Sequence, residues 1–115
     1  MPKTEREFFS TKTVDWTPAG GVDGLSERIL ATDPESGVAS RMLRFDAGTN
    51  TSSAGPQAHE FWEEVYILEG SLHDLTLNQT FTAGMYACRP PGMPHGPWIA
   101  PDGCVTFEVR YVSRG

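Results

Sequence analysis

Two clusters of residues in this 115-residue chain carry side chains that bind divalent metal ions. The first runs Gln57-Ala58-His59-Glu60-Phe61-Trp62-Glu63-Glu64, and the second ends on His95 after a turn rich in proline and glycine. In an extended segment Gln57 and His59 project from the same face, and a short bend would return Glu63 towards them. Two imidazoles and one carboxylate leave coordination positions open for a substrate or dioxygen. The pattern predicts a reactive metal site of His59, Glu63 and His95, with Gln57 as a candidate fourth ligand.

Several bulky side chains lie near these two clusters in the sequence. They could line a substrate pocket, since barrel interiors hold small ligands among apolar walls, or they could equally pack in the core. The candidates for the pocket are Phe61, Tyr66, His73, Tyr86 and Trp98.

The elements that must position the clusters are predicted to be short strands. Twelve glycines and nine prolines mark many turns, and no long helical pattern competes with them. Residues 105–112 alternate apolar and polar side chains, so we expect the face with Val105, Phe107, Val109 and Tyr111 to pack and the other face to be wet. Residues 65–68, Gly70 and residues 71–77 predict a strand, a turn and a returning strand. Further strands are predicted at residues 26–31, 40–46, 57–61, 85–89 and 95–99. Short strands at this spacing predict a sandwich or barrel, with a jelly roll among the options.

The composition excludes some classes of partner. A net charge of −6 and a pI near 4.9 argue against a nucleic-acid surface, which needs clustered basic residues. No apolar run is long enough to span a membrane, and residues 1–7 lack the apolar stretch of a signal peptide. We therefore expect a cytoplasmic protein that binds neither nucleic acid nor membrane. Cys88 and Cys104 lie in strand-like apolar contexts, so we expect both thiols to be buried and reduced.

The two clusters resemble the two motifs of the cupin superfamily. The first motif, G-x5-H-x-H-x3,4-E-x6-G, is matched by His59, Glu63 and Gly70, with Gln57 at the place of its first His and Thr51 at the place of its opening Gly. The spacing to Gly70 favours Glu63 over Glu64 as the ligand. The second motif, G-x5-P-x-G-x2-H-x3-N, is matched by Gly84, Pro90, Gly92 and His95, with Ile99 at the place of its Asn. Within the superfamily the chain is most similar to small cupins of the ChrR type.

The resemblance implies an all-β, cupin-type double-stranded β-helix, or jelly-roll barrel. It implies one domain over residues 1–115, with the barrel core at about residues 26–112 and an arm at residues 1–25. It also implies a homodimer and one divalent metal ion per chain, with Fe(II) expected first and Zn, Mn or Ni as alternatives.

Three functions agree with these residues. The first is an Fe(II) dioxygenase that cleaves a carbon–carbon bond of a small oxygenated molecule, with His59, Glu63 and His95 as catalytic residues; the ChrR-type group resembles enzymes acting on diketones and hydroxyketones. The second is a lyase, isomerase or cyclase without oxygen, in which Glu60, Glu64 or His73 moves a proton. The third is a sensor that binds a metal or small ligand without catalysis.

Overall fold

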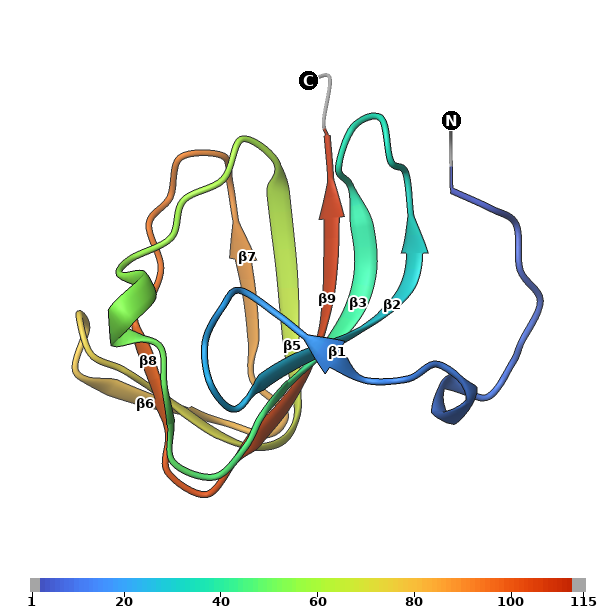
Figure 1. The fold of residues 1–115 in the computed structure, drawn as a ribbon. Helices are drawn as coiled ribbons and strands as arrows, with labels where there is room; N and C mark the ends of the chain where they lie inside the picture. Colours follow the sequence, from blue (N-terminus) through green and yellow to red (C-terminus); the bar gives the residue numbers. More distant parts are fainter. Residues whose placement is uncertain (1–2, 113–115) are drawn as a thin grey trace.

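The computed structural model describes residues 3–112 and is built almost entirely from strands (Figure 1). The helical content of this part is two short 3₁₀ turns, η1 (Thr11–Thr13) and η2 (Ser52–Ala54). The strands are β1 (Thr17–Pro18), β2 (Leu25–Thr32), β3 (Ala39–Phe45), β4 (Thr49–Asn50), β5 (Trp62–Asp74), β6 (Gln79–Thr82), β7 (Tyr86–Arg89), β8 (Trp98–Ala100) and β9 (Cys104–Tyr111). The all-β prediction is confirmed. No helix in residues 3–112 is long and apolar enough to cross a membrane.

The strands pair antiparallel and form two walls that share β5. One wall follows the order β1-β2-β3-β9-β5-β7, and the other contains β4, β8, β5 and β6. The sheet curls so that the two walls face each other across an interior (Figure 1). Because β5 pairs with β9 along most of its length and with three further strands, it is the element on which the barrel is organised.

Gly70 lies in the middle of β5, so the predicted turn at this residue is wrong. The chain does not reverse there but bends, and from Ser71 onward it pairs with β6 and β8 instead of β9 and β7. Gly70 has a φ of 77°, and a Cβ at this position would overlap the backbone of Gly103. A bend of this kind at a barrel corner requires glycine, and it produces the same interruption of the strand pattern as a turn.

The alternation predicted for the last strand is confirmed in period, but the faces are inverted. Thr106 and Glu108 are buried, whereas Phe107 is exposed on the outer surface. The polar face of β9 lies inside the barrel because its side chains form hydrogen bonds and ion pairs there with charged side chains from other strands. The apolar face is the outer one, which corrects the prediction that it packs in the core.

The apolar core occupies one end of the barrel. It is formed by Ala19, Leu43, Phe45, Ile67, Leu72, Ala100 and Cys104, with Leu25, Phe81 and Trp98 packed against it. Both cysteines are free; Cys104 belongs to this core and Cys88 is exposed on β7. The burial expected for Cys104 is confirmed, and the burial expected for Cys88 is wrong. The opposite end of the interior carries the charged residues, which are described next.

Candidate metal centre

Two loops and the beginning of β5 bring the predicted ligands together. His59 lies in the loop before β5, Glu63 is the second residue of β5, and His95 lies in the loop between β7 and β8. The two loops are joined by backbone hydrogen bonds: Gln57 and His95 each donate to the other's carbonyl at 2.8 Å, and Gly92 N donates to His59 O at 2.8 Å. The segment predicted as a strand at residues 57–61 therefore forms only this isolated bridge.

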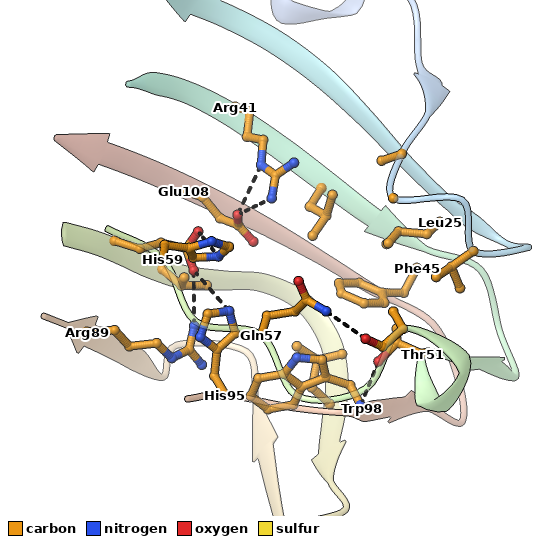
Figure 2. A pocket seen from close by; sticks show the side chains of 18 of the residues that line it. Leu25, Arg41, Phe45, Thr51, Gln57, His59, Arg89, His95, Trp98 and Glu108 are labelled. Carbon is orange, nitrogen blue, oxygen red and sulfur yellow. Dashed lines mark hydrogen bonds and ion pairs between the residues drawn. The ribbon is translucent and has the colours of Figure 1, made fainter. Parts of the chain in front are cut away.

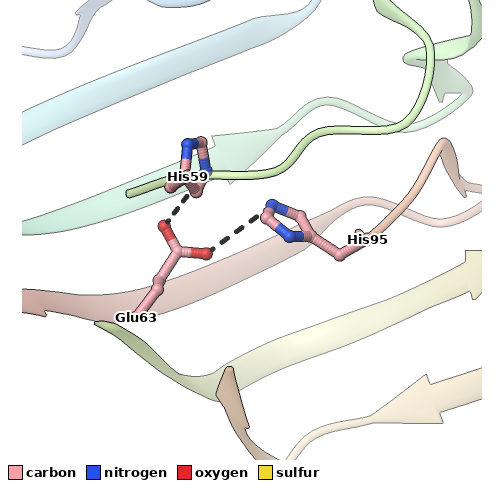
Figure 3. A group of neighbouring side chains, drawn as sticks. All are labelled: His59, Glu63 and His95. Carbon is pink, nitrogen blue, oxygen red and sulfur yellow. Dashed lines mark ion pairs between the residues drawn. The ribbon is translucent and has the colours of Figure 1, made fainter. Parts of the chain in front are cut away.

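The three predicted side chains converge on one point inside the barrel (Figure 3). Glu63 Oε2 lies 3.9 Å from His59 Nε2, and Glu63 Oε1 lies 3.8 Å from His95 Nε2. One ligand atom from each residue lies within 4.8 Å of the other two. Glu64 projects from the opposite face of β5 and accepts a hydrogen bond from Tyr86, so the register places Glu63, and not Glu64, in the group.

The protonation states of these residues fit a divalent metal ion. Burial lowers the pKa of His95 to about 4, and the charge of Arg89 acts in the same direction. Burial likewise lowers the pKa of His59. For Glu63 burial opposes ionisation, but the hydrogen bond and charge of Arg110 outweigh it and hold the pKa below its usual value. Two neutral imidazoles and one carboxylate at neutral pH offer the lone pairs that a metal ion needs.

Two arginines that the sequence analysis did not identify hold the carboxylate of Glu63. Arg110 Nε donates to Oε2 at 2.9 Å, and Arg89 Nη1 donates to Oε1 at 3.4 Å. Arg110 also lies over the ring of Phe61, 4.9 Å from its centroid. These contacts fix the position of a side chain that is only 3% exposed. Nothing in the local sequence signals them, because Glu63 and its two partners are distant along the chain.

A second charged group lies beside Glu63 on the same wall, on the neighbouring strands β9, β3 and β2. Arg41 donates from Nε and Nη2 to Glu108 Oε1 at 3.1 and 3.0 Å, and from Nη1 to Glu27 at 2.6 Å. Thr106 donates to the other oxygen of Glu108 at 3.1 Å. Burial raises the pKa of Glu108, although Arg41 opposes this change. For Thr106 and Glu108 the signal was the polar face of β9, which the sequence analysis assigned to solvent.

These groups line one end of a cavity of about 240 Å³ (Figure 2). Its polar end is lined by Arg41, Gln57, Glu63, Arg89, Glu108 and Arg110, together with the two histidines. Its apolar end is lined by Val22, Leu25, Leu43, Phe45, Leu72 and Trp98. A cavity of this kind, with a few convergent polar groups and an apolar wall, suits a small organic ligand with a polar head.

The side chains that were predicted to line the pocket lie in different parts of the structure. Trp98 lines the cavity. Tyr86 is largely exposed and lines, with Trp98, a second pocket of about 80 Å³. Phe61 stacks on His59 with ring centroids 4.7 Å apart. Tyr66 instead lies on the outer surface because its neighbours Val65 and Ile67 face inward.

The two remaining predicted side chains have separate positions. His73, predicted as a pocket residue, bonds through Nδ1 to Thr80 at 2.9 Å on the neighbouring strand, and it is not among the residues that line either cavity. Gln57 lines the cavity beside His95, to which it is joined through the backbone.

A curled antiparallel barrel with two imidazoles and a carboxylate at one end of its interior defines the cupin class. A family model described as "ChrR Cupin-like domain" matches residues 4–112, and the chain belongs to this family. No curated protein matches the sequence.

Solved structures with the same fold agree with this assignment. An RmlC-like cupin from Shewanella frigidimarina is 23% identical, with a TM-score of 0.74 over 99% of this chain and 96% of that one. The polyketide cyclase RemF from Streptomyces resistomycificus is 21% identical, with a TM-score of 0.71 over 92% and 79% of the two chains. An acetylacetone dioxygenase from Acinetobacter johnsonii is 18% identical, with a TM-score of 0.71 over 93% and 73%. At these identities the likeness shows the fold.

Proposed function

We propose that this chain is a metal-dependent cupin enzyme, a mononuclear Fe(II) dioxygenase that cleaves a carbon–carbon bond in a small oxygenated organic molecule. The observation that carries the proposal is the convergence of His59, Glu63 and His95 at the polar end of a cavity whose other end is apolar. Two histidines and one carboxylate with open positions are the usual ligand set of non-haem iron oxygenases. A fold shared with an acetylacetone dioxygenase supports the same class.

Each part of the cavity has a role in this proposal. When bound, the metal ion supplies a centre that activates the substrate or dioxygen. Arg89 and Arg110 hold Glu63 in one orientation, so the three ligand atoms stay in place when the substrate enters. Phe45, Leu72 and Trp98 exclude water from the apolar end and select a substrate with a short hydrocarbon part.

Oxygen consumption tests this proposal. Protein stripped of metal by a chelator would be loaded anaerobically with Fe(II), mixed with acetylacetone, acetoin or catechol, and followed with an oxygen electrode. We expect uptake with at least one compound, dependent on Fe(II) and lost in His59→Ala. The control variant is His73→Ala, which removes the histidine outside the group. If the iron-loaded protein takes up no oxygen with any of these compounds, the dioxygenase proposal is rejected.

A second candidate is a lyase, isomerase or cyclase that uses the metal as a Lewis acid, as the shared fold with a polyketide cyclase allows. The specific observation in its favour is Glu108, a buried cavity residue whose raised pKa suits a proton carrier. The residues first considered for this role are less suitable: neither cavity is lined by Glu60, Glu64 or His73. Turnover in the Zn(II)-loaded protein without oxygen would select this class.

A further inference from the structure

The side-chain amide of Gln57 is fixed at its nitrogen and open at its oxygen. Nε2 donates to the carbonyl oxygens of Ala54 at 2.9 Å and Gly55 at 3.3 Å. Both hydrogen bonds that this side chain forms within residues 3–112 use Nε2, and neither uses Oε1. Figure 2 shows the amide oxygen pointing into the cavity.

The chemistry of the neighbouring groups determines this orientation. Backbone carbonyls only accept hydrogen bonds, so the two carbonyls require the NH₂ end of the amide. Rotating the amide by 180° would place its oxygen against two other oxygens and lose both hydrogen bonds. The oxygen is therefore held as an acceptor that faces the cavity.

The position of this acceptor is set by His95. Residues directly opposite each other in an antiparallel pair project from the same face, with Cβ atoms about 4.5 to 5.5 Å apart. Gln57 and His95 form such a pair, so the amide lies next to one of the metal-binding imidazoles. Gln57 is exposed at the cavity, and the nearby guanidinium groups already bond carboxylates: Arg89 and Arg110 bond Glu63, and Arg41 bonds Glu108. The amide oxygen can therefore accept a hydrogen bond from a ligand bound in the cavity.

We propose that Gln57 is a substrate-binding residue whose amide oxygen accepts a hydrogen bond from a hydroxyl group next to the metal-binding oxygen of the substrate. The ligand class is an α-hydroxy carbonyl compound, either a hydroxy acid or a hydroxyketone. When the neighbouring carbonyl or carboxylate oxygen binds the metal ion, the hydroxyl group still has a proton to donate to Gln57. A fully oxidised dicarbonyl compound has no such donor. This inference rests on the proposed metal centre and assigns Gln57 to the substrate, not to the metal.

Ligand binding to the Zn(II)-loaded protein tests the inference without measuring turnover. The probes are lactate and 2-methoxypropanoate, which offer the same two oxygens to the metal but differ in the hydroxyl proton. The quantity measured by calorimetry is the ratio of their Kd values, ether over alcohol. Two variants separate the two ends of the amide: Gln57→Met removes both, whereas Gln57→Lys keeps donors for Ala54 and Gly55 and removes the acceptor. Zn(II) affinity is measured for every protein.

We expect both variants to lower the Kd ratio by about three- to tenfold, the effect of one neutral hydrogen bond. Zn(II) affinity in Gln57→Met should stay within about twofold of the wild type. A tenfold loss of Zn(II) affinity in that variant would make Gln57 a metal ligand and overturn the inference. A wild-type ratio in Gln57→Lys would also overturn it, because loop anchoring would then explain the preference. If the wild-type protein binds no metal, both the proposed function and the inference fail. If metal binds and the Kd ratio is the same in all three proteins, only the inference fails.

Discussion

Arg110 Nε donates a 2.9 Å hydrogen bond to the carboxylate oxygen of Glu63 that lies 3.9 Å from His59. The other oxygen is shared in the same way, between Arg89 at 3.4 Å and His95 at 3.8 Å. Each oxygen of Glu63 thus faces one guanidinium and one imidazole. A metal ion would enter between the imidazoles and the carboxylate while the arginines hold the carboxylate from the other side.

The first prediction concerns the hydrogen bond that Arg110 donates to the carboxylate of Glu63. Arg110→Met keeps an apolar stem against Phe61 but removes the donor to Glu63. We expect the metal-free protein to lose roughly 1.5 to 3 kcal/mol in its free energy of unfolding, the range for a hydrogen bond to a charged group. Because a bound metal ion supplies positive charge to the same carboxylate, the loss should be smaller in the Zn(II)-loaded protein. Urea unfolding with and without Zn(II) measures both values. An equal loss in both forms would contradict the idea that arginine and metal share Glu63.

The second prediction concerns metal affinity. His59→Ala and His95→Ala each remove one of the three converging ligands, so Zn(II) should no longer stabilise either variant. In the wild type, Zn(II) at a hundred times its Kd should add about 2.7 kcal/mol to the free energy of unfolding. Thermal unfolding with and without Zn(II) measures the effect. His73→Ala is the matched control, because His73 is bonded to Thr80 outside the group, and it should respond to Zn(II) like the wild type.

The third prediction concerns pH. In the metal-free protein the pKa of His95 is lowered to about 4 from 6.5, so between these values the unfolded chain binds a proton that the folded chain does not. The stability that comes from a neutral His95 is therefore fully present above pH 6.5 and is lost as the pH falls towards 4. Glu63, whose pKa is lowered from 4.5, acts in the same direction only below about pH 4.5 and so does not affect the comparison above pH 5. The urea concentration at the unfolding midpoint of the metal-free protein should decrease when the pH is lowered from 7.5 to 5. The decrease should be smaller in His95→Gln. A midpoint independent of pH would show that the imidazole is not buried.

The fourth prediction concerns the two thiols. Burial raises the pKa of Cys104 to about 11, so almost none of it is thiolate at pH 8, whereas Cys88 is exposed. A disulfide reagent should titrate one thiol in the folded protein and both in denaturant. Cys88→Ser should abolish the fast reaction. A fast reaction that remains in this variant would place Cys104 at the surface.

The fifth prediction concerns the bend in β5. Gly70 and Gly37 both have φ 77°, but a Cβ at Gly70 meets the backbone of Gly103 and a Cβ at Gly37 meets nothing within 4 Å. Gly37→Ala should lose roughly 1 kcal/mol or somewhat more, for the backbone conformation alone. Gly70→Ala should lose clearly more, because the two strands must also separate. Chemical unfolding of both variants measures the difference. Equal losses would mean that the close approach at Gly70 is unimportant.

The sequence predicted the all-β fold and the three metal-capable side chains that the structure brings together, because each of the two clusters has a characteristic local spacing. The short run from His59 to Glu63 and the proline-rich turn before His95 are properties of adjacent residues. That these side chains converge in space was inferred from the resemblance of the two clusters to the two cupin motifs. The hairpin at Gly70 was predicted wrongly because a glycine that bends a strand and a glycine that ends one leave the same local pattern.

The charged wall of the cavity could not be predicted in the same way. Alternation along residues 105–112 identifies two faces but does not say which face lies inside, and the usual rule places the apolar one there. Here Glu108 and Arg110 lie inside because Arg41 and Glu63, from other strands, satisfy them. Such pairing between distant segments has no signature in a single sequence. The same limit explains why Tyr66 was expected in the pocket and lies outside it.

The bend at Gly70 also bears on how a ligand reaches the interior. Since β5 runs through both walls, the walls are covalently continuous at this corner, with residues 62–70 paired to β9 in one wall and residues 71–74 paired to β6 in the other. The loops that carry Gln57, His59 and His95 are instead joined to each other by only a few backbone hydrogen bonds. In the proposed function a ligand would enter past these loops, which carry Gln57 and two of the three proposed metal ligands, His59 and His95.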